Sequence, residues 1–263
     1  MLSIRMAEPH HRQIELSIIA PAHNEEENVG PLIVEIDAAL ISLSGRFEII
    51  IVDDGSTDRT LERATTLMAE RAWLRVLRML DTPAGRGHGQ SAAFHAGLRA
   101  ARGDLIALLD ADLQNDPADL PRLLELMHES GADVVQGDRS SHRRDTAGRR
   151  LASWVGRSFR RLLLADTIRD TGCSLRVMRR EAALAIPLEF CGMHRFIPLT
   201  ARQMGFTVIE VPVSHRPRTS GQAKYGVFNR ALPGLLDGLA VRWMHRRRRP
   251  TRASEITRDG ASE

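Results

Sequence analysis

Short apolar runs alternate with longer amphipathic runs through the first half of the chain, and no other feature of the sequence constrains the fold as strongly. Nearly continuous apolar runs are typical of strands that are buried on both faces, and apolar residues at a helical period indicate the helices that cover them. The alternation predicts an α/β fold with a doubly wound, mainly parallel sheet and helices on both of its faces. The expected strands are 16–20, 47–52, 74–77, 104–109 and 133–136, and the expected helices are 28–43, 60–70, 89–101 and 120–129.

The pattern changes after about residue 139, because residues 139–161 hold eight arginines against one acidic residue, Asp145. Strand-like runs return at 174–178 and 207–213, around an expected helix at 194–204, and an amphipathic run at 227–244 follows. We therefore divide the chain into an N-terminal extension, 1–15, a main domain, 16–226, a basic amphipathic helix, 227–249, and a disordered tail, 250–263.

The composition limits the classes of protein to which the chain can belong. With 263 residues, 43% of them hydrophobic and 27% charged, it fits a globular domain and excludes a fully disordered or fibrous protein. No run approaches the ~18–20 apolar residues of a membrane span, and the N-terminal residues lack the apolar core of a signal peptide. The two cysteines, Cys173 and Cys191, are too few for a disulfide framework, so we expect a reducing, cytoplasmic environment.

Acidic clusters follow three of the expected strands. The first strand ends in Pro21-Ala22-His23-Asn24-Glu25, the second in Asp53-Asp54-Gly55-Ser56-Thr57-Asp58, and the fourth in Asp110-Ala111-Asp112-Leu113-Gln114. Ligands of open α/β sheets bind beyond the carboxyl ends of the strands, so these clusters are expected to converge on one site. Converging carboxylates repel one another unless a cation or donor groups compensate them.

The Asp-x-Asp pair, with the amide of Gln114 nearby, offers the hard oxygen ligands that Mg²⁺ or Mn²⁺ prefers. Other phosphate motifs are excluded, since there is no P-loop and the spacing of Gly85, Gly87 and Gly89 is wrong for a dinucleotide fingerprint. Two interpretations of Gly87-His88-Gly89 stay open: its backbone amides approach a phosphate, or it is only a turn before a helix.

Together these motifs resemble the family 2 glycosyltransferases with the Rossmann-like GT-A fold. Further segments resemble the branch that includes dolichol-phosphate mannosyltransferase, which moves a sugar from a nucleotide diphosphate onto a polyprenyl phosphate. The resemblance runs from about residue 16 to 243. Besides the three clusters, it rests on Gly87-His88-Gly89-Gln90-Ser91-Ala92, Gly137-Asp138-Arg139, Asp170-Thr171-Gly172-Cys173 and Arg218-Thr219-Ser220-Gly221-Gln222-Ala223-Lys224-Tyr225.

The resemblance implies a role for each matching residue. Asp110, Asp112 and Gln114 would hold the metal, Mg²⁺ or Mn²⁺, with Ala111 between the carboxylates. The phosphates of donor or acceptor would be held by Arg139, Arg218 and Lys224, and the nucleotide by Pro21, His23, Glu25, Val52, Asp53 and Asp54, with GDP-mannose and UDP-sugars as candidate donors. His23 departs from the Tyr that many members carry. Many bacterial relatives carry C-terminal transmembrane helices, and we expect none in residues 1–263.

The implied reaction is a single displacement with inversion, in which a lipid phosphate attacks the sugar. Lys224, the one Lys among 37 basic residues, lies in a Gly-containing stretch that we expect to close over the diphosphate; the alternative is a solvated surface lysine. Asp170 is expected to orient the acceptor or a neighbouring arginine, or only to cap a turn. One alternative is a hydroxyl acceptor, for which Asp170 would be the base. The other, a nucleic-acid binder using residues 139–161, fails to explain the acidic clusters, so we expect no nucleic-acid partner.

The C-terminal segment suggests how the chain reaches a lipid acceptor. Apolar residues recur at helical spacing over 227–244, Pro233 and Gly234 are expected to kink or break the run, and Trp243 and Met244 adjoin His245 and the arginines at 246–249. Such a segment suits a helix in the membrane interface, with residues 139–161 as a second contact, and predicts a peripheral enzyme on the cytoplasmic face of the membrane. The alternative is a helix packed on the domain with a solvated basic tail.

Overall fold

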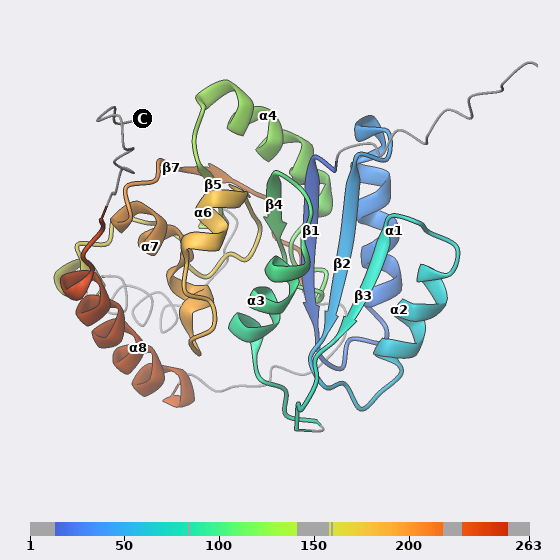
Figure 1. Cartoon of the computed structure of the whole chain (residues 1–263), viewed down its shortest axis with the longest axis horizontal. Helices are drawn as coiled ribbons and strands as arrows, with labels where there is room; N and C mark the ends of the chain where they lie inside the picture. Colours follow the sequence, from blue (N-terminus) through green and yellow to red (C-terminus); the bar gives the residue numbers. More distant parts are fainter. Residues whose placement is uncertain (1–13, 84, 141–157, 159, 218–227, 252–263) are drawn as a thin grey trace, which may run out of the picture.

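A seven-stranded sheet forms the centre of the molecule, with the strand order β3-β2-β1-β4-β6-β5-β7 (Figure 1). The computed structural model describes residues 14–83, 85–140, 158, 160–217 and 228–251. Within them, the strand pairs are parallel except those of β6, which runs antiparallel to both β4 and β5. The predicted mainly parallel sheet is confirmed. The strands are β1 Leu16–Ala22, β2 Phe47–Asp53, β3 Leu74–Arg78, β4 Leu105–Leu108, β5 Val134–Asp138, β6 Arg176–Arg179 and β7 Val208–Pro212.

The sequence pattern did not predict the reversed direction of β6. Because β6 is antiparallel to its neighbours, it begins at the edge of the sheet where β4 and β5 end. The segment that leads into β6 therefore reaches the carboxyl ends of β4 and β5. This segment contains Asp170, Cys173 and Ser174, so the reversal adds a wall to the site that parallel strands alone would not supply.

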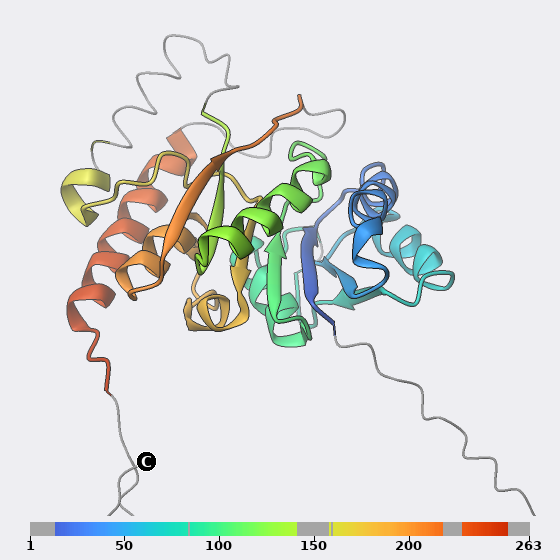
Figure 2. The ribbon, with the colours of Figure 1, turned by 90° about the horizontal axis from the view of Figure 1, so that it is seen from above.

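Helices cover both faces of the sheet, as predicted (Figure 2). One buried apolar cluster joins the sheet to α1, α2 and α4, and a second joins its other face to α3, α6 and α7. The expected helix 28–43 is α1 followed by a short 3-10 turn, and the expected helix 194–204 is a 3-10 turn followed by α7. The helix α6 was not predicted. The bounds are α1 Val29–Ala39, α2 Thr60–Met68, α3 Gln90–Ala100, α4 Leu120–Ser130, α6 Arg180–Ala185 and α7 Ile197–Gln203.

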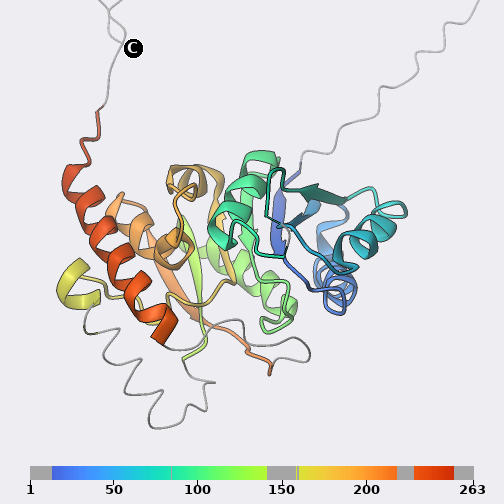
Figure 3. The same cartoon turned by 90° about the horizontal axis from the view of Figure 1, so that it is seen from below.

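The last helix, α8 Phe228–Arg247, lies at the end of the molecule beside α7 (Figures 1 and 3). It is a single helix with Pro233 inside it, so the expected break at Pro233 and Gly234 does not occur. Arg195 forms an ion pair with Asp237 at 3.5 Å, and Val241 is buried in the second apolar cluster, so part of α8 packs on the domain. Of the helices in the described part of the chain, none is long and apolar enough to cross a membrane.

We predict that Gly97→Ala destabilises the fold. Gly97 faces β1 and β2, where a Cβ atom would overlap the side chain of Ile19 and lie 3.1 Å from Val52 Cγ2. Overpacking a core of this kind costs about 1–3 kcal/mol, which urea unfolding measures. Gly30→Ala in α1 is the matched control, because its Cβ would lie 3.8 Å from Leu67 Cδ1, an ordinary contact. Equal unfolding free energies for the two variants would contradict the close packing of α3 on the sheet.

Candidate active site

The turns that follow β1 and β2 are joined to each other by hydrogen bonds. His23 Nδ1 lies 2.6 Å from the backbone carbonyl of Asp54, so this ring nitrogen is assigned as the protonated donor. Asn24 adopts a left-handed backbone conformation, with a φ of 55°, and its backbone amide donates to Ser56 Oγ at 3.0 Å. Its side-chain oxygen accepts from the backbone amide of Thr57 at 2.8 Å. The first two acidic clusters therefore form one unit, as the sequence predicted.

The Asp54 carboxylate holds the glycine-containing turn before α3. It accepts hydrogen bonds from the backbone amides of His88, at 2.8 Å, and Gly89, at 2.7 Å. Gly87 has a φ of +67°, and a Cβ atom there would lie 2.5 Å from Asp54 Oδ2, so no larger residue fits without movement. Of the two interpretations of this motif, the structure supports the turn, since the two amides already bind Asp54.

Asp53 differs from its neighbour Asp54. Its side chain is buried, and its Oδ1 has no hydrogen-bond partner among the described residues. A buried carboxylate oxygen without a partner is costly, because it has lost the hydrogen bonds that water supplied. Pro21 pairs with Val52 and Ala22 with Asp53 in the register of β1 and β2, so these residues share the same edge. Asp53 Oδ1, at the carboxyl ends of β1 and β2, is therefore a hydrogen-bond acceptor that a ligand could use.

Asp110 and Asp112 follow β4 in a loop that neighbouring elements hold in place. The amide of Asp110 donates to Ser174 Oγ at 3.2 Å, and its carboxylate accepts from the side-chain amide of Gln90 in α3. Asp112 is 8% exposed and accepts from the backbone amide of Gln114 at 3.2 Å. Burial, and then the charge of Asp112, raises the pKa of Asp110 to about 6. The carboxylate pair is thus short of compensating positive charge.

Arg139 and Asp170 form a buried, two-pronged ion pair at the same edge. Arg139 Nε and Nη2 donate to the two oxygens of Asp170 at 2.8 and 3.2 Å. The backbone amide of Arg139 donates to the same carboxylate at 3.2 Å, and that of Gly172 at 3.1 Å. The side chains of Arg139 and Asp170 are 10% and 6% exposed. Of the roles left open for Asp170, the structure contains two, since the carboxylate orients Arg139 and also caps the turn at Gly172.

Arg176, on β6, is the functional candidate that the sequence analysis missed. Its side chain is buried, and burial lowers its pKa to about 10. The guanidinium donates to the backbone carbonyls of Ser174, at 3.2 Å, and Cys173, and more weakly to that of His194, at 3.5 Å. The signal was present, because Arg176 interrupts an apolar strand and arginine is almost never fully buried without partners.

Hydrogen bonds and short chain links connect Arg176 to Asp110 through His194 and the start of α3. Ser91, next to Gln90 at the start of α3, bonds His194 Nδ1 at 2.8 Å and accepts from the His194 amide at 3.0 Å. Burial, and then the charges of Arg195 and Arg176, lowers the pKa of His194 to about 3, so the His194 imidazole is neutral at physiological pH. The arrangement links α3 to the Asp110 carboxylate and the segment before β6 to the Asp110 backbone amide.

The donor set of Asp110 and Asp112 fits a divalent cation that also binds a substrate. In the described part of the chain, no cluster of three or more His, Cys, Asp or Glu side chains could hold a metal ion. Two carboxylates are nevertheless what Mg²⁺ uses when substrate phosphates complete its coordination. The raised pKa of Asp110 agrees with a missing positive charge at this position.

The remaining predicted site residues are less informative. Glu25 accepts a hydrogen bond from Asn28 Nδ2 at 2.6 Å, and Ala111 is buried between the two aspartates. Arg218 and Lys224 lie outside the described residues, as do residues 141–157 of the expected second membrane contact. The role of Gln114 as a metal ligand stays a prediction.

Comparison with known proteins shows what the chain is similar to. The sequence model of the family described as Glycosyl transferase family 2 matches residues 17–186. The chain is 36% identical to a dodecaprenyl-phosphate galacturonate synthase of Rhizobium johnstonii, over 89% of this chain and 68% of that relative. It is also 36% identical to an undecaprenyl-phosphate 4-deoxy-4-formamido-L-arabinose transferase of Edwardsiella ictaluri, over 81% of this chain and 63% of that relative. The chain therefore spans about two thirds of the length of each relative.

A solved structure supports the fold class. A glucosyl-3-phosphoglycerate synthase from Mycobacterium tuberculosis, in complex with Mn²⁺, uridine diphosphate and phosphoglyceric acid, matches with a TM-score of 0.64. The match covers 87% of this chain and 78% of that chain at 22% identity, so it bears on the fold alone. The predicted GT-A type of α/β fold is confirmed.

We predict that Asp170→Asn strongly destabilises the domain. The substitution keeps the shape of the side chain but leaves the buried Arg139 without its ionic partner, which costs about 3–5 kcal/mol for buried pairs. Unfolding in urea measures the loss. The matched control is Glu62→Gln, which breaks the exposed two-pronged pair with Arg59 and should leave the unfolding free energy unchanged within error. Similar losses of unfolding free energy in the two variants would contradict the claim that the buried Arg139–Asp170 pair stabilises the domain.

Proposed function

The chain belongs to glycosyl transferase family 2, and on this basis we propose that it transfers a sugar from a nucleotide-diphosphate sugar to a polyprenyl phosphate. One observation carries the proposal: the Asp110–Asp112 pair lies at the carboxyl edge of the sheet and is short of positive charge, beside the buried Arg139. The two relatives named above, by their names, act on polyprenyl phosphates. GDP-mannose and UDP-sugars are the candidate donors.

The nucleotide would bind along the ends of β1 and β2. We propose that Asp53 accepts a hydrogen bond from the base or ribose, because its Oδ1 is buried without a partner among the described residues. His23 and Glu25 would line the same pocket, with Pro21 and Val52 at its edge. Asp54 acts indirectly, since its carboxylate holds the turn before α3.

The donor diphosphate would lie over Asp110 and Asp112, which would hold Mg²⁺ or Mn²⁺, with Gln114 as a further ligand. Such an ion neutralises charge on the leaving diphosphate as a Lewis acid. Gln90 and Ser174 fix the position of Asp110, so the carboxylate does not have to reorganise when the ligand binds. Arg139, Arg218 and Lys224 would bind donor or acceptor phosphates through charge-assisted hydrogen bonds, and Lys224 would close over the diphosphate.

The acceptor phosphate attacks without help from a strong base. Its second pKa is about 6, so it is already an anion near neutral pH. An acceptor oxygen forms a bond to the anomeric carbon while the bond from that carbon to the diphosphate breaks, and the diphosphate leaves with the electron pair. The configuration at the carbon inverts in this single step.

A hydroxyl acceptor is less consistent with the site. That reaction needs a carboxylate base, and Asp170, the candidate from the sequence, is bound through both oxygens to Arg139. Both oxygens already accept hydrogen bonds from a cation, so neither is placed to take a proton from an acceptor hydroxyl. The phosphate acceptor is therefore favoured over the hydroxyl acceptor. We propose no nucleic-acid partner, since the carboxylates at this edge would repel its phosphates.

We further propose that residues 16–226 form the catalytic domain and that 227–249 attach it to the cytoplasmic face of the membrane. Arg246, Arg247, Arg248 and Arg249 are all exposed at the end of α8, where they suit anionic headgroups. The exposed apolar side chains of α8 include Leu236, at 57%, and Trp243, at 63%. An aromatic residue beside a cationic run is typical of interfacial helices.

We predict that Asp110→Ala and Asp112→Ala each abolish Mn²⁺ binding and metal-dependent sugar transfer while the domain stays folded. Each removes one of the two carboxylates proposed to hold the ion. Electron paramagnetic resonance measures free Mn²⁺ directly, and radiolabelled donor measures transfer. Glu129→Ala is the control, because Glu129 is an exposed carboxylate on α4 and its loss leaves the site intact. Full transfer by either aspartate variant, or by the parent in excess chelator, would exclude the metal assignment.

We predict that replacing all four arginines at 246–249 by Gln releases the protein from anionic vesicles. Each basic residue near such a surface contributes roughly 1 kcal/mol, so the full set decides binding. Flotation with phosphatidylglycerol vesicles should recover the parent with the lipid and leave the variant in solution, and high salt should release the parent too. A variant that floats like the parent would show that the arginines are not the anchor.

A further inference from the structure

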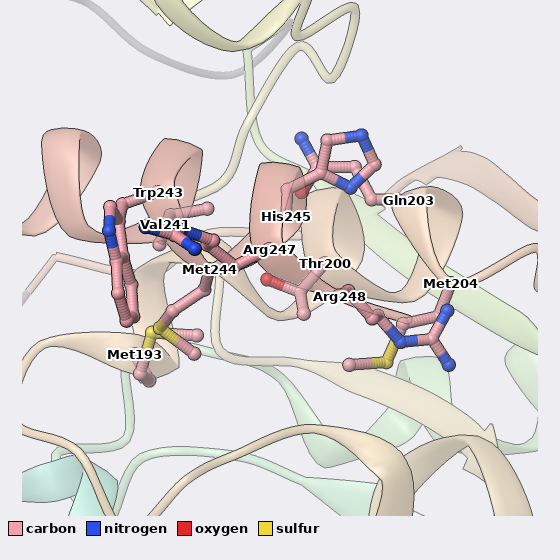
Figure 4. A pocket seen from close by; sticks show the side chains of 10 residues that line it. All are labelled: Met193, Thr200, Gln203, Met204, Val241, Trp243, Met244, His245, Arg247 and Arg248. Carbon is pink, nitrogen blue, oxygen red and sulfur yellow. The ribbon is translucent and has the colours of Figure 1, made fainter. Parts of the chain in front are cut away.

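A groove of about 290 Å³ lies between the C-terminal half of α8 and the segment that contains α7 (Figure 4). Met193 and Val241, both 3% exposed, form its apolar floor, and Trp243 and Met204 form part of its walls. Methionine side chains adapt to irregular apolar ligands because they are unbranched and flexible. The groove is thus suited to an aliphatic chain.

Thr200 supplies a second, independent sign that the groove binds a ligand. Its side chain is 6% exposed and lines the groove, and its hydroxyl has no hydrogen-bond partner in the part of the chain that the structure describes. Figure 4 shows Thr200 between Trp243 and Met193 on one side and Arg248 and Met204 on the other. Buried hydroxyls are almost always satisfied, so an unpaired one inside a groove indicates a polar atom of a ligand.

Only some of the basic residues at the end of α8 lie at the rim of the groove. Arg247 and Arg248 line it together with His245, whereas the neighbouring Arg246 and Arg249 do not. The guanidinium of Arg247 lies 6.0 Å from the centre of the Trp243 ring, which also belongs to the exposed apolar side of α8. An apolar groove with two arginines at its rim is complementary to an amphiphile with an anionic head.

The groove is separate from the candidate active site. In Figure 1, α8 begins near the carboxyl edge of the sheet, and its C-terminal turns, which carry the groove, lead away from that edge. An acceptor whose phosphate lies at Asp110 and Asp112 does not place the same phosphate at Arg247 and Arg248. The ligand of the groove therefore brings its own phosphate.

We propose that the groove binds one anionic phospholipid of the bilayer, with part of an acyl chain between Met193, Val241 and Met204 and the headgroup phosphate at Arg247 and Arg248. The glycerol ester region lies at the depth of Thr200, whose hydroxyl donates to an ester oxygen. This inference rests on the membrane attachment proposed above and makes it site-specific. The general attraction of a basic run needs no groove, so the two accounts make different predictions.

Two double variants with the same change in charge separate these accounts. Arg247→Glu with Arg248→Glu alters the rim of the groove, and Arg246→Glu with Arg249→Glu alters the same run outside it; all four side chains are exposed. Binding is measured by flotation with vesicles of phosphatidylcholine, with and without phosphatidylglycerol. We expect the rim variant to bind phosphatidylglycerol vesicles about tenfold more weakly than the control variant, which corresponds to about 1.4 kcal/mol. Equal losses would overturn the proposal in favour of general electrostatic attraction.

The fluorescence of Trp243 tests whether the lipid acyl chain lies in the groove. Phospholipids brominated on the acyl chain should quench the part of the emission that Trp243→Phe removes, so the parent should be quenched more than the Trp243→Phe protein. Polyprenyl phosphate is then added to the vesicles while the total bilayer charge is kept equal. If it reverses the quenching, the polyprenyl chain of the acceptor occupies the groove and the proposal is overturned. If the Trp243 emission falls as the protein concentration is raised in the absence of lipid, the groove is occupied by a second copy of the protein. That result would also overturn the proposal.

The control for the catalytic proposal uses a short-chain, water-soluble acceptor. The rim variant should transfer sugar to this acceptor at the parent rate, because the groove lies away from the site. If the parent itself transfers no sugar, the proposed function fails while the vesicle and quenching results still decide the groove. A rim variant that loses transfer to the soluble acceptor would show that the arginines act in the active site, which contradicts a separate lipid groove.

Discussion

Negative charge buried at one edge of a parallel sheet is the constraint on which the rest of the site depends. Asp110, Asp112 and Asp170 lose most of their contact with water there, and each needs donors or positive charge in return. Arg139 meets this need for Asp170 through a two-pronged ion pair. The buried charge of Arg176 acts on Asp110 and Asp170 while its guanidinium holds backbone carbonyls of the loop before β6. The antiparallel β6 is what brings this arginine under the site.

The compensation is incomplete, and the shortfall gives the site its chemistry. The pKa of Asp110 stays raised despite Arg139 and Arg176, and Asp53 Oδ1 stays without a partner in the described structure. A nucleotide diphosphate with a divalent ion would supply both missing elements, a cation for the aspartate pair and a donor for Asp53. The same reasoning favours a phosphate acceptor, because Asp170 is occupied by Arg139 and because a phosphate already carries its negative charge.

Local sequence patterns predicted most of the fold and the three clusters, since strand burial, helical period and strand-end position are local properties. They did not predict the direction of β6, which depends on pairing with β4 and β5, elements distant in the chain. Arg176 was missed because its burial depends on the place of β6 inside the sheet, although two of its partners, the backbone carbonyls of Ser174 and Cys173, are local. Pro233 does not break α8, so the helix continues through a residue whose propensity alone predicts an interruption.

The central claim is that Asp53 binds the base or ribose of a nucleotide diphosphate, while the Asp110–Asp112 pair binds its phosphates through a divalent ion. Thermal unfolding with a panel of nucleotide sugars, each with Mn²⁺ and with chelator, tests it most directly. A ligand present at 100 times its dissociation constant stabilises the native state by about 2.7 kcal/mol, which raises the unfolding temperature by a few degrees. The account predicts such a rise for at least one nucleotide sugar with Mn²⁺ and none for the same compound in chelator. Equal stabilisation with and without the metal, or none by any nucleotide sugar, would contradict it.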